Sequence, residues 1–238
     1  MRRLMIGIFI LLLSGKAWAA LDIPPVTYPK LPRQGAVAEA FVPKGWKLEA
    51  QQKGDLNKDG VDDLLILLRM DEARNVIQNE GFGPNLFDTN PRILAVAFGA
   101  KAKPYRLALE NHTLITRPTV PTLEDLLTEN GGVAIENGTL KVALNVFQSA
   151  GGWSTWLSTF RFRHGKRGFE LIGFDRRTLK RNSGEVSEES INYLTGKVSI
   201  GTGTIEDDKL DVKWRKLTKQ RLILINEIVD GLEFEPKY

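Results

Sequence analysis

The chain has 238 residues, of which 42% are hydrophobic and 26% are charged, a composition ordinary for a globular protein. It contains no cysteine, which excludes a disulfide scaffold and a lipid anchor attached to cysteine. Lysine and arginine number 33 against 29 aspartates and glutamates. Three of these basic residues and no acid lie in residues 1–19, so the remaining chain is close to neutral and has no global attraction for nucleic acid.

Residues 1–19 have the pattern of a bacterial secretory signal peptide. Arg2 and Arg3 give a positive start, and an apolar run follows at Met5–Leu13. Ala17 and Ala19 then supply the small residues that a signal peptidase recognises. The apolar run is far shorter than the roughly 20 residues that a membrane-spanning helix needs. We therefore predict a periplasmic or secreted protein with no membrane span after the signal is cleaved.

The segment after the signal peptide is rich in proline. Four prolines in residues 20–35 predict an extended N-terminal arm outside the core, because proline fixes φ and lacks an amide donor. We expect residues 36–238 to form a single β-rich domain. At its start, Ala36–Phe41 suits a short helical turn and Trp46–Gln52 suits a strand.

Two apolar runs in the first half predict buried strands. They are Leu64–Met70 and Arg92–Phe98, and Tyr105–Glu110 is expected to pair with the second of them. The polar stretch between them, residues 71–90, predicts a long loop with one helical turn. Leu123–Leu127 suits a brief helix.

The second half contains two clear hairpin patterns. An Asn-Gly pair at 137–138 separates Val133–Glu136 from Thr139–Phe147, and this pair favours the positive φ values of a tight hairpin turn. Thr155–Arg163 and Phe169–Phe174 flank a second polar turn.

Further strands are expected at Ile191–Ile200 and Asp211–Arg215, with a bend at residues 201–203 between them. Leu222–Val229 suits either a strand or a short helix. Short strands joined by hairpin turns favour a mainly β fold, either an antiparallel sandwich or a strongly bent sheet, with a few short helices.

One motif carries recognisable chemistry, the sequence D-x-N-x-D-G-x-x-D at residues 55–63. Calcium prefers six to eight hard oxygen ligands, and a tight turn brings alternate loop positions around one point. The glycine at position 60 suits the sharp turn. The predicted ligands are Asp55, Asn57, Asp59, the backbone carbonyl of Val61, and Asp63. The alternative is an ordinary acidic turn, since Asp, Asn and Gly also build turns through local hydrogen bonds.

The residues around this motif separate it from an EF-hand. Position 12 is Ile66 instead of a bidentate glutamate, and the run that follows is strand-like. Over Gly54–Leu68 the sequence resembles the calcium loop of FG-GAP and VCBS-type repeats. In that family the loop joins two β-strands and an aspartate completes the shell. The resemblance implies a structural Ca²⁺ ion between two strands, of the modest affinity found in extracellular modules.

Two further groups of side chains are candidates for ligand contact. Arg161 and Arg163 alternate with phenylalanines, which predicts a cationic face on one side of a strand. Such a face would suit an anionic envelope polymer or protein, although a solvated outer face explains the same pattern. Trp153 and Trp156 lie beside two glycines and suit stacking on a ligand, or closing one end of the core.

No residue pattern identifies a catalytic group. The two histidines stand apart, and there is no nucleophile motif of the kind found in serine hydrolases. We therefore expect a non-enzymatic calcium-binding protein with a binding or structural role in the cell envelope. The alternative is a periplasmic hydrolase or inhibitor that acts on a cell-wall polymer.

Overall fold

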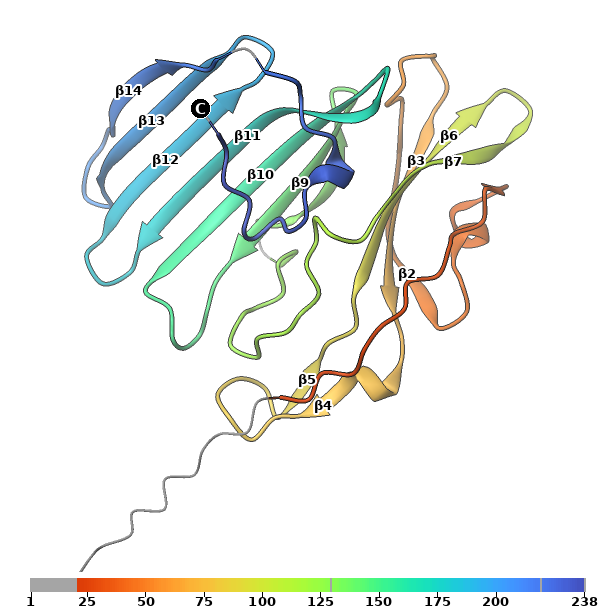
Figure 1. Cartoon of the computed structure of the whole chain (residues 1–238), viewed down its shortest axis with the longest axis horizontal. Coiled ribbons are helices and arrows are strands. Elements are labelled where there is room, and N and C mark those ends of the chain that lie inside the picture. The colour runs from red at the N-terminus through yellow and green to blue at the C-terminus, as the bar shows by residue number, and fades with distance from the viewer. Residues whose placement is uncertain (1–20, 129, 219, 238) are drawn as a thin grey trace, which may run out of the picture.

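The computed structural model describes residues 21–128, 130–218 and 220–237, so the predicted signal peptide lies outside the described residues. Strands dominate this part of the chain and form three antiparallel sheets (Figure 1). Its helical segments are three short 3₁₀ turns, η1 (Ala38–Phe41), η2 (Ala73–Asn75) and η3 (Ile225–Glu227). The predicted fold class is confirmed, since the chain is mainly β and its antiparallel sheets are consistent with a sandwich.

The five-stranded sheet, called the small sheet, has two central strands that are buried on both faces. Its order is β1 (Gln34–Gly35), β7 (Lys103–Asn111), β6 (Arg92–Ala100), β3 (Asp63–Met70) and β2 (Trp46–Gly54). Residues 64–68 of β3 and 93–97 of β6 are all buried. The continuous apolar runs in the sequence therefore reflect strands that are covered on both sides.

Strand β3 contributes to two separate cores, because successive side chains point to opposite faces of a sheet. Leu64 and Ile66 pack with Phe41 of η1 on one face. Leu65 and Leu67 belong to the main core on the other face. The small sheet is thus a central layer, with the N-terminal segment on one face and the seven-stranded sheet on the other.

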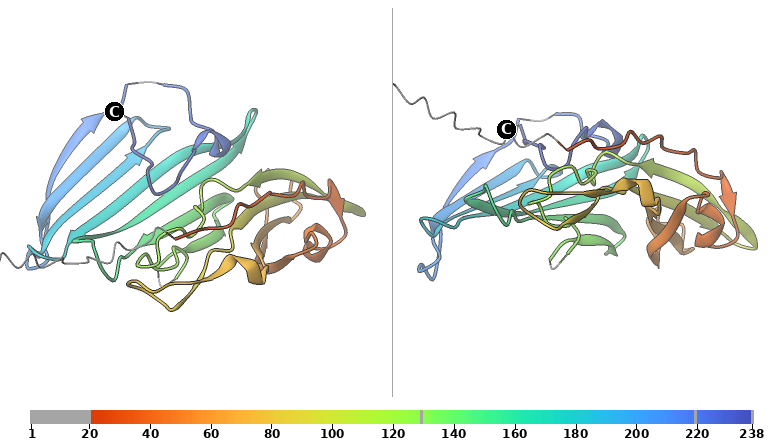
Figure 2. Two further views of the ribbon diagram at one scale, coloured as in Figure 1. Left: turned by 60° about the horizontal axis from the view of Figure 1, so that its bottom comes forward. Right: turned by 90° about the horizontal axis from the view of Figure 1, so that it is seen from below.

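The seven-stranded sheet, called the large sheet, is a meander in which each strand pairs with the next. Strands β8–β11 lie beside the small sheet, and β12–β14 lie on the side away from it (Figures 1 and 2). The strands are β8 (Gly132–Glu136), β9 (Thr139–Val146), β10 (Ser154–Gly165), β11 (Gly168–Lys180), β12 (Glu185–Asn192), β13 (Lys197–Thr204) and β14 (Asp211–Lys216).

The inner face of the large sheet is closed by the C-terminal segment, which crosses it after β14 (Figure 2). Phe160 and Phe174 are fully buried on this face. The ring of Phe234 lies 5.3 Å from that of Phe160 and 5.1 Å from that of Phe174. Within this segment, the predicted strand or helix at Leu222–Val229 is mostly irregular and contains only η3.

The proline-rich arm is extended, as predicted, but the expectation that it lies outside the core is wrong. Leu31 is 5% exposed and belongs to the core under the small sheet. The ring of Tyr28 stacks on His112 at 4.0 Å. Arg117 donates a hydrogen bond of 2.7 Å to the carbonyl of Pro24. The arm therefore packs along the small sheet as part of the domain.

Two predictions of local structure in the second half are wrong for identifiable reasons. The predicted strand Ile191–Ile200 is divided by a turn, because the side chain of Asn192 accepts hydrogen bonds from the N–H groups of Leu194 and Thr195. Residues 201–203 lie inside β13 without forming a bend. The side chain of Leu210 covers this glycine-containing stretch, and a Cβ built on Gly203 would lie 2.8 Å from it.

Two loops in the first half also differ from expectation. Residues 71–90 contain the predicted helical turn, η2, but also a small hairpin of β4 (Val76–Gln78) and β5 (Leu86–Asp88). The predicted helix at Leu123–Leu127 is absent, and Leu123 instead forms an isolated bridge with Gln148.

The aromatic cluster of the main core gives a stability prediction. We expect Phe174→Ala to lower the free energy of unfolding by about 3–5 kcal/mol, because the cavity left among buried rings cannot collapse fully. Urea unfolding of the chain without residues 1–19 measures this loss of free energy. Val212→Ala on the exposed edge strand is the control, and its effect should stay within about 0.5 kcal/mol. Equal losses in the two variants would contradict the assignment of the core.

Candidate functional site

The acidic loop, residues 55–63, connects β2 to β3 at one end of the small sheet. Gly54 and Asp63 form the last residue pair of the two strands, so the loop begins and ends at the same point. The carboxylate of Asp55 accepts hydrogen bonds from the backbone N–H groups of Lys58 at 2.6 Å and Gly60 at 2.9 Å. One side chain therefore organises the whole turn.

Two more of the predicted ligands hold the turn by local bonds. Asn57 Oδ1 accepts from the N–H of Asp59 at 2.9 Å, and Asp59 Oδ1 accepts from the N–H of Val61 at 2.9 Å. Gly60 has a φ of +81°, as the motif predicts. Lys58 also has a positive φ, of +66°, which is uncommon for a residue with a side chain.

The last predicted ligand, Asp63, lies fully buried beneath the loop. Its Oδ2 accepts hydrogen bonds from the N–H groups of Leu56 at 2.8 Å and Asn57 at 3.3 Å. Its Oδ1 accepts one from the N–H of Gly99 in β6 at 3.0 Å. Burial raises the pKa of Asp63 above its ordinary value, although the three N–H groups act in the opposite direction. Asp63 thus ties the loop to the neighbouring strand.

The donor set of the loop fits calcium in its chemistry, since every predicted ligand atom is an oxygen. Within the described ranges, no three acidic, histidine or cysteine side chains are close enough together to hold a metal ion as they stand. Asp63 Oδ1 and Asn57 Oδ1 each accept a single bond, so each has a lone pair left for an ion. An ion in the loop would therefore require its acidic side chains to lie closer together than they do here.

The acidic loop is packed against strand β6 and the β8–β9 turn, and it faces the tip of the β10–β11 hairpin. A Cβ built on Gly99 would lie 2.2 Å from the carbonyl oxygen of Asp62, so β6 touches the loop directly. One built on Gly138 of the β8–β9 turn would lie 3.3 Å from the carbonyl oxygen of Asp55. Lys58 lines one side of a groove of about 640 Å³, and the tip of the β10–β11 hairpin lines the other.

The predicted cationic face is only partly free. Phe160 and Phe162 are buried, and Arg161 and Arg163 lie on the opposite face of β10, as their alternation predicts. Arg161 forms an ion pair with Asp175, so its positive charge is compensated and does not add to the charge of this face. Arg163 lines the groove beside Lys58.

The two predicted tryptophans do not form one surface. Trp153 is 72% exposed and lies beside Arg181 in a shallow hollow. Trp156 is half-buried and packs against the main core. The stacking interpretation therefore applies to Trp153 alone, and Trp156 closes the end of the core.

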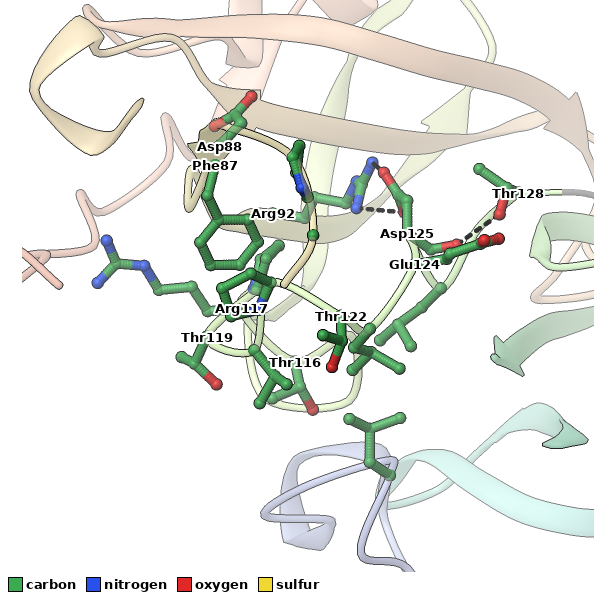
Figure 3. A pocket seen from close by; sticks show the side chains of 18 of the residues that line it. Phe87, Asp88, Arg92, Thr116, Arg117, Thr119, Thr122, Glu124, Asp125 and Thr128 are labelled. Carbon is green, nitrogen blue, oxygen red and sulfur yellow. Dashed lines mark hydrogen bonds and ion pairs between the residues drawn. The ribbon is translucent and has the colours of Figure 1, made fainter. Parts of the chain in front are cut away.

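A second polar site, which the sequence did not reveal, lies at the other end of β3 and β6. It is a cavity of about 730 Å³ (Figure 3). Arg92 is 5% exposed and donates to both carboxylate oxygens of Glu49, at 2.6 and 2.7 Å. It also donates to Asp125 at 2.6 and 2.9 Å. Arg69 pairs with Asp88 at 3.0 Å.

The pairing with Arg92 fixes the charge of Asp125, an acid that lines this cavity. Burial alone would raise the pKa of Asp125, but the hydrogen bonds and positive charge of Arg92 hold it below its ordinary value. The members of the network are far apart in the sequence, so no local motif marks them. The available indication is an arginine at one end of each of two apolar strands, Arg69 in β3 and Arg92 in β6, because buried arginines are nearly always paired.

Comparison with known proteins found no matching family model, no matching curated protein and no matching solved structure. No helix among the described residues is long and apolar enough to cross a membrane.

The buried ion network gives a second prediction. We expect Arg92→Met to destabilise the fold by about 3–5 kcal/mol, because it leaves Glu49 and Asp125 with only their longer contacts to Arg69, at 3.5 Å each. The double variant with Asp125→Asn should lose less than the sum of the two single variants. Chemical denaturation of the four proteins in the cycle measures this coupling, and strict additivity would contradict the pairing.

The lowered pKa of Asp125 gives a pH prediction. A carboxyl whose folded pKa lies below its unfolded value stabilises the fold above the unfolded pKa, and this contribution is lost as pH falls through the folded value. The stability gap between the wild type and Asp125→Asn should therefore be full near pH 6. It should narrow below the ordinary aspartate pKa of 3.8. A gap that is unchanged or wider at low pH would refute the assignment.

Proposed function

We propose that the protein is an exported, non-enzymatic β protein that binds a structural calcium ion in the acidic loop and serves a binding or supporting role in the cell envelope. The observation that carries the proposal is the loop itself. Alternate residues present oxygen atoms around a turn whose base is a fully buried carboxylate, Asp63. The export signal predicted in residues 1–19 supports the compartment, where calcium is available at the concentrations that extracellular modules require.

The charge of the loop supports an ion. Asp55, Asp59 and Asp63 lie within nine residues of each other, and the raised pKa of Asp63 reflects burial with the charge of Asp59 nearby. A divalent cation would offset this repulsion and the cost of burying a carboxylate. The ion would be held by these three residues with Asn57 and the carbonyl of Val61. Its chemistry there would be electrostatic, fixing the loop between β2 and β3.

The absence of a glutamate at loop position 12 sets the expected affinity. Ile66 occupies that position and is fully buried in β3, so it cannot be exchanged for a ligand without opening the core. With fewer ligands than an EF-hand, the site should resemble extracellular modules with dissociation constants of about 10⁻⁴–10⁻³ M.

The alternative function, hydrolysis of a cell-wall polymer, finds less support. A hydrolase of that kind needs one carboxyl that keeps its proton near neutral pH, which requires a raised pKa. In the 730 Å³ cavity, Asp125 has a lowered pKa and is bound to Arg92, which also holds Glu49. These acids are neutralised by arginine, which suits a structural network.

Thermal unfolding tests the calcium proposal. An ion that binds only the folded state at ten times its dissociation constant should stabilise it by about 1.4 kcal/mol. For a chain of this size the melting temperature should rise by about 3–6 °C. The measurement compares the mature protein in chelator and in about 10 mM calcium, ten times the weakest dissociation constant in the expected range.

Matched variants separate ligation from loop charge. The double variant Asp55→Asn and Asp59→Asn should lose the calcium response. Asp62→Asn changes a charge in the same loop at a position outside the predicted ligand set, and it should keep the response. A wild-type protein that ignores calcium, or an equal loss in both variants, would refute the proposal.

A further inference from the structure

The groove between the acidic loop and the β10–β11 hairpin is strongly cationic. It is lined by Lys58, Arg163, His164, Gly165, Lys166, Arg167 and Glu170. Its single acid, Glu170, is bound by Arg167 at 2.9 Å. The side chains of Lys58, Arg163 and Lys166 form no ion pair within the described ranges, so three unpaired positive charges line the groove beside the carboxylates of the acidic loop.

This concentration of charge is local. Three basic residues of the neighbouring strand β11 are neutralised or turned away. Arg177 pairs with Glu188, and Lys180 pairs with Glu185. Arg176 reaches across the inner face to Glu235 and to the carbonyl of Phe234. The broad cationic face expected from sequence is therefore reduced to the groove at the hairpin tip.

We propose that this groove binds a phosphate group, and that calcium in the acidic loop strengthens the binding. Three convergent cations match a dianionic oxyanion better than a single carboxylate. Arg163 can supply paired N–H donors, and Lys58 and Lys166 supply mobile point charges. The calcium part of this inference rests on the proposed function, whereas the groove and its charges do not.

Lys58 is the physical link between the two sites. Its N–H is bound to Asp55 Oδ1 at 2.6 Å, and it lies between the predicted ligands Asn57 and Asp59. Its backbone is held at a φ of +66°. An ion would fix this conformation and would also cancel the negative charge of the loop, which otherwise repels an anion in the groove. By linkage, phosphate would strengthen calcium binding by the same factor.

Titration with glycerol phosphate, a soluble phosphate ester, tests the proposal by calorimetry in chelator and in about 1 mM calcium, within the expected affinity range. We expect calcium to tighten phosphate binding by about fivefold or more. Arg163→Glu with Lys166→Glu should weaken binding by about tenfold or more, since charged hydrogen bonds are lost. The matched control, Lys213→Glu with Arg215→Glu, makes the same charge change on the distant edge strand β14 and should leave the affinity nearly unchanged.

Lys58→Gly isolates the link, because glycine adopts a positive φ freely while the ammonium group is removed. This variant should keep the thermal response to calcium but show a smaller calcium effect on phosphate binding, because only the cancellation of the loop charge remains. Equal affinities with and without calcium, or equal losses in the groove and control variants, would overturn the inference. A calcium response in melting without phosphate binding overturns the inference alone, whereas no calcium response overturns the proposed function.

Vesicles identify the source of the phosphate. Binding to phosphatidylglycerol vesicles but not to phosphatidylcholine vesicles, lost in the groove variant and kept in the β14 control, would assign the group to a lipid headgroup. Binding of glycerol phosphate without vesicle binding would assign it to a soluble or polymer-borne ester. Both results support the groove as a phosphate site. A protein that binds neither glycerol phosphate nor the vesicles would refute it.

Discussion

The carboxylate of Asp63 is the interaction on which the two ends of the acidic loop and the neighbouring strand depend. It is fully buried, and it accepts hydrogen bonds from two residues at the start of the loop and from Gly99 of β6. A buried charge of this kind is costly unless each of its oxygens is satisfied. The three N–H groups supply hydrogen bonds to both oxygens of Asp63, and they fix the loop at the same time. An ion above the carboxylate would complete the compensation of its charge.

Asp63 also explains why the loop cannot be rearranged independently of the core. Leu56, whose N–H binds Asp63, is 1% exposed and packs into the main core. Gly99 approaches the carbonyl of Asp62 so closely that a side chain there would collide with backbone. The loop is therefore seated by one apolar side chain, one buried carboxylate and one glycine. The predicted ligands Asp55, Asn57 and Asp59 remain on its outer side, where an ion can arrive from solvent.

Much of this fold follows from local sequence, because its strands are paired mainly with their neighbours in the chain. Each strand of the large sheet pairs with the next, so alternation and turn residues were enough to predict the hairpins around residues 137–138 and 164–168. Two of the misses arose where a residue outside the segment decides the outcome. Leu210 covers the glycines of β13, and Arg92 binds Asp125 inside the segment that was expected to be helical. Periodicity cannot report such contacts.

The same distinction separates the two polar sites. The acidic loop is contiguous in sequence, so its ligand pattern could be recognised from one segment. The ion network joins Glu49, Arg69, Arg92 and Asp125, whose proximity depends on the pairing of β2, β3 and β6 and on a later loop. The cationic groove falls between these two cases, because only part of it can be recognised from one segment of the sequence. The alternation in the sequence predicts that Arg163 lies on a cationic face, but the contribution of Lys58 depends on how the two sheets pack.

The position of the two polar sites on β3 argues for a structural role of the ion. Asp63 begins the strand and Arg69 lies near its end, with only buried apolar residues between them. At about 3.3 Å per residue, the six steps separate the acidic loop from the 730 Å³ cavity by roughly 20 Å. An ion in the loop is therefore too far away to act on anything bound in that cavity. Its effect would be on the small sheet, whose first hairpin carries the acidic loop, and on the groove that Lys58 shares with the large sheet.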